Sequence, residues 1–293
     1  MAEGLFGFFG RDLNSALQQG LKRDLAANAK AARELLLTAL ALALLALGLY
    51  LAGGYHTGFA ELNTWARAYP PWLWQNLTLL GDEHLAFALT LFFSRRHPRV
   101  FWTLICAALI GAAYARGLKP LIDALRPPAV LEAGSFQLIG PGHRHHSFPS
   151  GHGVTAGVLF GVLMYHARWV EWRLLFLLLA LLAGLSRVAL GVHWPVDVAA
   201  GLAGGLLAAW LGAGLARRLP WGVIDTSVHL ALVTLAVIMA IALALAGRGY
   251  PDALWPGRVL VAMALLSALL SYVVGPMARY LWMRRRAVLE RSF

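Results

Sequence analysis

The sequence predicts an all-α fold, a polytopic bundle of membrane-spanning helices. Of the 293 residues, 59% are hydrophobic and only 13% are charged, whereas a soluble domain carries about 25% charged residues. The mean hydropathy is +0.65, and apolar runs long enough to cross a bilayer follow one another along the chain. We therefore expect the lipid bilayer to be the main partner of this protein.

The first segment, residues 1–31, is amphipathic. Leucines at 13, 17, 21 and 25 recur at helical spacing between basic residues. An interfacial helix on the inner leaflet is one interpretation, and a frayed polar tail is the other.

Eight membrane spans are expected after this segment. The first six form a core over residues 32–215, and residues 216–293 add two spans and a basic tail. The fourth and fifth are short for a perpendicular helix, so they require tilt or burial. The expected spans are 32–52, 74–93, 99–117, 152–167, 172–190, 196–215, 223–246 and 258–282.

The basic residues indicate how the chain is oriented. Seventeen of the 25 lysines and arginines fall on the side that carries both termini, and eight fall on the other. This bias places both termini in the cytoplasm. The net charge of +11 does not indicate nucleic-acid binding, because the basic residues lie in the connections between spans. Cys106 is the only cysteine, so the chain forms no disulfide framework.

Three polar clusters interrupt the apolar sequence, all at expected outer ends of spans. The first contains Lys119 and Arg126, seven residues apart and expected on one helical face, where both cations can hold an anion. Taken alone, this cluster would be explained better as two snorkelling interfacial residues.

The second cluster is Ser150-Gly151-His152, directly before an apolar run. Ser150 is a candidate helix cap, Gly151 allows close approach of an anion to free amides, and His152 can donate a proton to a leaving oxygen. An ordinary helix cap with an interfacial histidine is the alternative.

The third cluster contains Arg187, His193 and Asp197. Pro195 suits a helix start, so the carboxylate of Asp197 can accept the proton of one imidazole nitrogen of His193 and leave the other free for attack. A buried Asp–His pair that closes a helix end is the alternative. Together the clusters provide what is needed to hold and attack a phosphate group.

Lys-x6-Arg-Pro, Pro-Ser-Gly-His and Ser-Arg-x5-His-x3-Asp, in this order, resemble the full signature of the type 2 phosphatidic acid phosphatase superfamily. The resemblance covers the six-span core. It implies that His193 is the nucleophile that forms a phosphohistidine, that Asp197 orients it, and that His152 is the general acid. It implies a phosphate-binding set of Lys119, Arg126, Ser150, Gly151 and Arg187.

The resemblance further implies a metal-independent lipid phosphatase without a cofactor. Its active site would face the periplasm from a bacterial inner membrane. The expected substrate is a lipid phosphate: undecaprenyl diphosphate, phosphatidylglycerophosphate, phosphatidate or lipid A 1-phosphate. A lipid phosphotransferase with the same intermediate is the alternative, and a transporter or membrane scaffold is the alternative of a different class. No obligate protein partner is expected.

Two further polar groups lie outside these blocks. Asp82 and Glu83, next to His84, are expected near the outer end of the second span, as part of the substrate entry or as a simple polar turn. The loop His143-Arg144-His145-His146 is expected to form a cationic lip, in which Arg144 could contact a second phosphate. A metal site there is disfavoured, because adjacent imidazoles lack cysteine or carboxylate partners.

Overall fold

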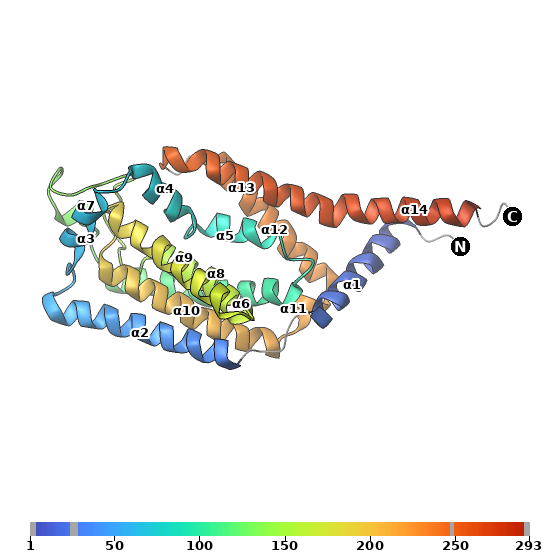
Figure 1. Ribbon diagram of the computed structural model, residues 1–293, viewed down its shortest axis with the longest axis horizontal. Coiled ribbons are helices and arrows are strands. Elements are labelled where there is room, and N and C mark those ends of the chain that lie inside the picture. The colour runs from blue at the N-terminus through green and yellow to red at the C-terminus, as the bar shows by residue number, and fades with distance from the viewer. Residues whose placement is uncertain (1–3, 24–28, 247–248, 290–293) are drawn as a thin grey trace.

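The computed structural model describes residues 4–23, 29–246 and 249–289, and every regular element within these ranges is helical (Figure 1). The all-α prediction is therefore confirmed. The elements are α1 Leu5–Arg23, α2 Ala29–Gly53, α3 Phe59–Ala66, α4 Pro71–Leu79, α5 Glu83–Thr90, α6 Pro98–Ile122, α7 Pro127–Val130, α8 Gly151–His166, α9 Val170–Ala189, α10 Pro195–Arg218, α11 Trp221–Ile224, α12 Thr226–Leu245, α13 Pro251–Leu269, the π-helix η1 Leu270–Val274 and α14 Gly275–Leu289.

Six helical runs in the described part of the chain are long and apolar enough to cross a membrane. The protein is therefore a multi-pass membrane protein, but the expected number of eight spans is not confirmed. The six runs are Ala29–Gly53, Pro98–Val130, Val170–Ala189, Pro195–Arg218, Thr226–Leu245 and Pro251–Arg286.

The expected span at 74–93 is wrong as a continuous helix, because the chain forms α4 and α5 there, separated by a turn. Asp82 begins α5 as its N-cap: its Oδ1 accepts hydrogen bonds from the backbone N–H groups of His84 at 2.8 Å and Leu85 at 3.2 Å. A capping carboxylate stabilises a new helix start rather than the continuation of the preceding helix. The expected span at 152–167 is α8, a helix of 16 residues that is buried among α6, α9 and α10.

Helix α10 lies at the centre of the bundle and packs against α2, α6, α8 and α9. Its glycines allow α8 to approach closely. A Cβ at Gly205 would lie 2.3 Å from the carbonyl oxygen of Val154, and one at Gly201 would lie 2.6 Å from that of Ser150. Small residues at such crossings let two membrane helices pack backbone against backbone. The N-terminal ends of α8 and α10 are therefore held side by side.

The two ends of the bundle carry different features (Figure 1). One end holds the C-terminal end of α2, the N-terminal ends of α8 and α10, and the short helices α3 and α7. The other end holds α1 and the projecting α14, where both chain termini lie. The polar clusters and the termini are thus at opposite ends, as the expected topology requires. Which end faces the cytoplasm stays a prediction.

The amphipathic N-terminal segment forms α1, and its apolar face is covered by the protein itself. Phe8, Leu13 and Leu17 are buried, and α1 packs against α6, α11, α12 and α14. Asp12 accepts hydrogen bonds from Arg95 and Arg279. Burial raises the pKa of the Asp12 carboxyl, but these two arginines outweigh it and hold the pKa below its ordinary value. Leu25 lies outside the described residues.

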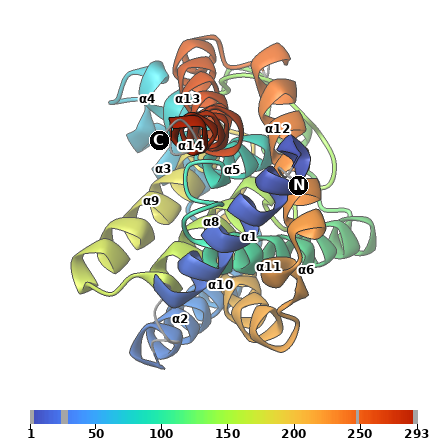
Figure 2. The same ribbon diagram turned by 90° about the vertical axis from the view of Figure 1, so that its right-hand side faces the viewer.

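The C-terminal helices form a separate side of the bundle. Helix α12 packs against α5, and α13 packs against α4, α5 and α12. Figure 2 shows α12 and α13 on one side of the bundle and α2 on the opposite side. These additional helices therefore reach the broken α4–α5 segment.

Candidate active site

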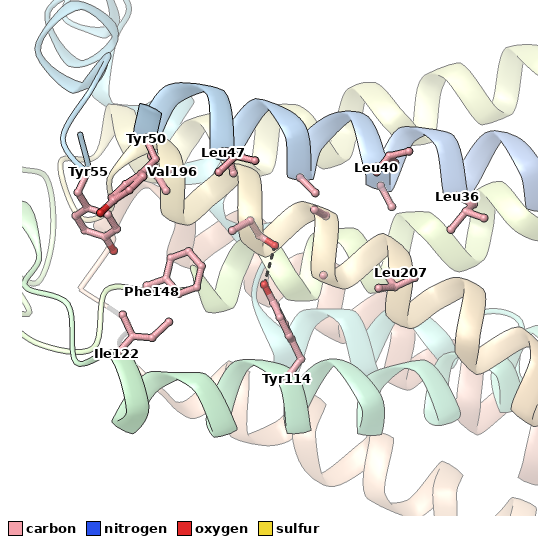
Figure 3. A pocket seen from close by; sticks show the side chains of 16 residues that line it. Leu36, Leu40, Leu47, Tyr50, Tyr55, Tyr114, Ile122, Phe148, Val196 and Leu207 are labelled. Carbon is pink, nitrogen blue, oxygen red and sulfur yellow. Dashed lines mark hydrogen bonds between the residues drawn. The ribbon is translucent and has the colours of Figure 1, made fainter. Parts of the chain in front are cut away.

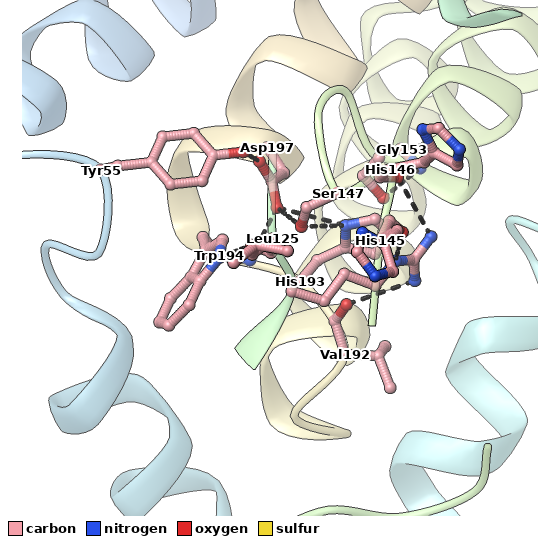
Figure 4. A network of polar contacts seen from close by, with 12 residues as sticks. Tyr55, Leu125, His145, His146, Ser147, Gly153, Val192, His193, Trp194 and Asp197 are labelled. Atoms are coloured by element: carbon pink, nitrogen blue, oxygen red, sulfur yellow. Dashed lines mark hydrogen bonds and ion pairs between the residues drawn. The ribbon is translucent and has the colours of Figure 1, made fainter. Parts of the chain in front are cut away.

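Asp197 lies in the first turn of α10, is fully buried, and binds four hydrogen-bond donors (Figure 4). Its Oδ2 accepts from Ser147 Oγ at 2.5 Å and from the backbone N–H of Trp194 at 2.9 Å, and it lies 3.2 Å from His193 Nδ1. Its Oδ1 accepts from the hydroxyl of Tyr55. A carboxylate with this many donors is fixed in one orientation and stays in its acceptor form.

His193 is only 2% exposed and sits between α9 and α10. Because Nδ1 faces Asp197 as a donor, Nε2 carries the lone pair of the neutral ring. Burial lowers the pKa of His193 well below its ordinary value, and the positive charges of Arg126, Arg187 and Lys119 lower it further. The imidazole is therefore neutral at physiological pH.

Arg126 is held beside His193 by backbone carbonyl groups. Its Nε donates to His145 O at 3.0 Å, Nη1 to Val192 O at 3.4 Å, and Nη2 to His146 O at 3.4 Å. A guanidinium has five N–H donors in a fixed plane. Two of them are left for an anion in the pocket, so the carbonyl groups orient the cation without neutralising it.

Arg187 comes from the last turn of α9 and is 4% exposed. Its Nη1 donates to Thr78 Oγ1 at 2.7 Å and to the hydroxyl of Tyr250 at 3.0 Å. Its Nε is buried and has no hydrogen-bond partner among the described residues. Unpaired buried N–H groups of a guanidinium are costly, and a bound phosphate oxygen would satisfy this one. Tyr250 is the residue directly before α13, so the C-terminal part of the chain reaches the site.

Lys119, Gly151 and His152 lie together along a cavity of about 530 Å³. Gly151 and the ammonium group are neighbours, since a Cβ at Gly151 would lie 3.6 Å from Lys119 Nζ, an ordinary van der Waals distance. Ser150 caps α8 as predicted: its Oγ accepts from Gly153 N at 3.3 Å, and its own N–H donates to Asp197 O at 3.0 Å. The second cluster is thereby joined to the third.

One expectation about the first cluster is wrong: Lys119 and Arg126 do not share a helical face. Helix α6 ends at Ile122, and Asp123 adopts a left-handed conformation with φ 40°. The chain then turns, and the backbone N–H of Arg126 donates to Arg144 O at 2.9 Å. The two cations converge because the loop folds back, not because of helical periodicity.

The lip residues act through their backbone more than through their side chains. The side chains of His143, Arg144, His145 and His146 are exposed, while three of their carbonyl groups accept hydrogen bonds from Arg126. Burial and the cations Arg126, Arg187 and Lys119 lower the pKa of His143. Asp82 and Glu83 both line the cavity next to His152, and Glu83 lies 3.8 Å from Arg116.

Sequence reasoning missed several residues that support the site. Tyr55 and Ser147 bind Asp197, and His56 stacks on Trp194 at 3.9 Å between ring centroids. Burial raises the pKa of Tyr55, and the neighbouring Asp197 carboxylate raises it further, so its hydroxyl remains a donor. A lone Tyr or Ser in a polar connection carries no sequence signal that would identify it.

The long connection between α7 and α8 is anchored by Asn63 and Gln137. Asn63 Nδ2 donates to Gln137 O and Val188 O, both at 3.0 Å, and Asn63 Oδ1 accepts from Gln137 N at 2.8 Å. Gly191, with φ 76°, fits beneath this loop, because a Cβ there would lie 2.1 Å from Gln137 O. The loop is therefore fixed against the end of α9 that carries Arg187.

Residues 100–221 match the family model of the PAP2 superfamily, and this range contains all three clusters. This part of the chain is similar to that superfamily. Among the described residues, no group of three or more His, Cys, Asp and Glu side chains is arranged to hold a metal ion.

Similar proteins include a "Lipid A 1-phosphatase" from Rhizobium johnstonii, 35% identical over 36% of this chain and 42% of that protein. An "Undecaprenyl-diphosphatase" from Sulfolobus acidocaldarius is 33% identical over 46% of this chain and 64% of that protein. The chain thus spans less than two thirds of each relative. The crystal structure of Aquifex aeolicus LpxE is similar with a TM-score of 0.48 and 27% identity, covering 53% of this chain and 91% of that one.

The contact between Tyr250 and Arg187 predicts that the C-terminal helices influence anion binding. Tyr250→Phe removes one acceptor from the guanidinium and keeps the ring, while Thr78 still binds. We expect the affinity for orthovanadate, measured by calorimetry in detergent, to fall roughly three- to tenfold, within the range for one hydrogen bond to a charged group. Tyr272→Phe is the matched control: Tyr272 also lies on the C-terminal helices and is hydrogen-bonded, to Ser94 at 2.9 Å. Equal losses in both variants would contradict a specific role for Tyr250.

Proposed function

We propose that the protein is an integral membrane lipid phosphatase that works through a phosphohistidine at His193. The observation that carries the proposal is the position of His193. Its ring is neutral, buried, and bonded at Nδ1 to a fixed carboxylate. Three cations lie near it, and one of them, Arg187, has a buried Nε that binds no hydrogen-bond acceptor among the described residues. This arrangement combines an activated nucleophile with preorganised charge for a phosphoryl group.

The chemistry follows in two steps. In the first, the Nε2 lone pair of His193 forms a bond to phosphorus while the bond from phosphorus to the lipid oxygen breaks, and His152 gives its proton to that oxygen. In the second, water attacks phosphorus, the P–N bond breaks, and His152 takes the proton from the water. The products are the dephosphorylated lipid and inorganic phosphate.

The residues have complementary roles in this scheme. Arg126, Arg187 and Lys119 bind the non-bridging oxygens, and the N-terminal amide of α8 at Gly151, which Ser150 positions as the helix cap, faces the same group. Asp197 holds the His193 ring in one tautomer and stabilises the positive charge that develops on it. Three cations can neutralise the transferring phosphoryl group, so we infer that hydrolysis requires no metal ion.

The substrate carries its phosphate at the membrane interface and its tails in the bilayer. The relatives named for lipid A 1-phosphate and undecaprenyl diphosphate support a lipid phosphate or diphosphate. Phosphatidate and phosphatidylglycerophosphate belong to the same chemical class. The excess of basic residues at the end opposite the site supports a periplasmic active site in a bacterial inner membrane.

The roles of the two histidines are separable by kinetics. His193→Ala should abolish phosphate release from every substrate. His152→Ala should slow the release from lipid phosphates roughly 10²- to 10⁴-fold, the usual contribution of a general acid. It should affect aryl phosphates much less, because a phenolate leaves without protonation. The assay measures phosphate release in detergent with EDTA present throughout. Hydrolysis by His193→Ala, or a strict requirement for added magnesium, would refute the scheme.

The proposed topology predicts which cysteines are accessible in intact cells. Ser135→Cys, in the exposed loop before α8, should react with an impermeant maleimide in a Cys106→Ser background. Ser227→Cys is the control, because Ser227 is exposed near the start of α12 at the opposite end of the bundle. It should react only after permeabilisation. The reverse pattern would place the active site in the cytoplasm.

A further inference from the structure

Two apolar cavities extend along the bundle from the active-site end. The first, of about 620 Å³, lies between α2, α6 and α10. Figure 3 shows its lining by Leu36, Leu40 and Leu207, with Tyr55 and Phe148 at the active-site end. The second, of about 530 Å³, lies between α5, α6, α8 and α12. Both volumes fall in the range of ligand-binding cavities.

The two cavities differ in the groups at their active-site ends. The second is lined by Lys119, Gly151 and His152. Lys119 is a proposed phosphate-binding cation, Gly151 has no side chain to cover its backbone, and His152 is the proposed acid. The first reaches the site at Tyr55, whose hydroxyl is already bound to Asp197, and at the apolar side chains of Phe148 and Val196. A substrate with an anionic head and an apolar tail therefore matches the second cavity along its whole length.

The stereochemistry of phosphoryl transfer leads to the same choice. In the first step, the attacking nitrogen of His193 and the leaving lipid oxygen lie roughly in line on opposite sides of phosphorus. The nucleophile is on the Asp197 side, so the leaving oxygen and the lipid attached to it lie on the side of the acid. His152 lines the second cavity, whereas the first is lined by Tyr55, which binds the Asp197 carboxylate on the nucleophile side.

The wall of the second cavity opposite α6 comes from the C-terminal helices. Leu232, Leu235 and Met239 of α12 line it. Helix α12 packs on α5 and α13, while α6 packs on α8 and α10, so the cavity runs between these two groups of helices. Leu235 and Leu109, on either side of it, are 42% and 66% exposed. Both walls of the cavity therefore carry exposed leucines, which suit contact with hydrocarbon chains.

We propose that this second cavity binds the hydrocarbon chain of the lipid phosphate and that α12 determines which chain fits. The proposal rests on the proposed function, because it places the lipid oxygen next to His152. It also assigns a role to helices that lie outside the matched family region, which ends at residue 221. Glu83 and Arg116 lie at the polar rim of the same cavity, where a head group would pass.

Photo-crosslinking tests the site without requiring turnover. A phosphatidate with a diazirine at mid-chain is bound to the His193→Ala or His193→Gln variant in nanodiscs and activated by light. We expect label on α12 between Leu232 and Met239, removed by excess unlabelled phosphatidate. The same diazirine on a diacylglycerol should label this segment much less. Label on α2 between Leu36 and Tyr50, or equal label from both probes, would overturn the proposal.

Chain-length selectivity provides the second measurement. Leu235→Trp narrows the second cavity, and Leu207→Trp narrows the first; the two leucines are similarly exposed, at 42% and 40%. We expect Leu235→Trp to lower kcat/KM for dioleoyl phosphatidate at least tenfold relative to dihexanoyl phosphatidate, and Leu207→Trp to change the ratio less than twofold. The reverse pattern would place the chain in the first cavity. Absence of phosphate release by the wild-type protein would refute the proposed function but not the lipid-chain site. The crosslinking experiment tests that site separately, because it requires binding and no turnover.

Discussion

The buried carboxylate of Asp197 is the group on which the rest of the site depends. It binds Tyr55 from the segment after α2, Ser147 from the loop before α8, and Trp194 and His193 from the turn before α10. A buried ionised group without its partners costs several kcal/mol, so these segments must assemble around it. The same packing explains the close approach of α8 to α10, because Ser150 donates to the carbonyl oxygen of Asp197. His193 and the Ser150 turn at the start of α8 are thereby placed by one set of contacts.

The cations around this carboxylate are oriented by neutral groups rather than by acidic residues. Backbone carbonyl groups hold Arg126, and two hydroxyl groups hold Arg187. A carboxylate partner would cancel the charge, whereas a carbonyl or hydroxyl group fixes the side chain and preserves it. The pocket therefore retains a positive potential, which adds to burial in lowering the pKa of His193 and would favour a bound anion. Tyr250, directly before α13, is one of the two hydroxyl groups that hold Arg187. The C-terminal part of the chain therefore contributes to the proposed anion site and, through α12, to the second cavity.

The sequence predicted the fold class and the chemical groups of the site, because both depend on local signals. Apolar length indicates a membrane helix, and Ser150 and Pro195 are recognisable helix starts. The break at Asp82 was not predicted, since the hydropathy of 74–93 is that of a continuous span and only the capping contacts reveal two helices. The convergence of Lys119 and Arg126 was predicted for the wrong reason. It depends on the folded loop that Asn63 and Gln137 anchor, and such long-range contacts leave no periodic pattern.

The central claim is that His193 becomes covalently phosphorylated. Rapid quenching in base after mixing the protein with a 32P-labelled lipid phosphate tests this most directly, because phosphohistidine survives base and is lost in acid. The account predicts a burst of protein-bound, acid-labile phosphate that peptide mapping assigns to His193 and that is absent from His193→Ala. Complete single turnover without protein-bound phosphate, or label on another residue, would contradict it.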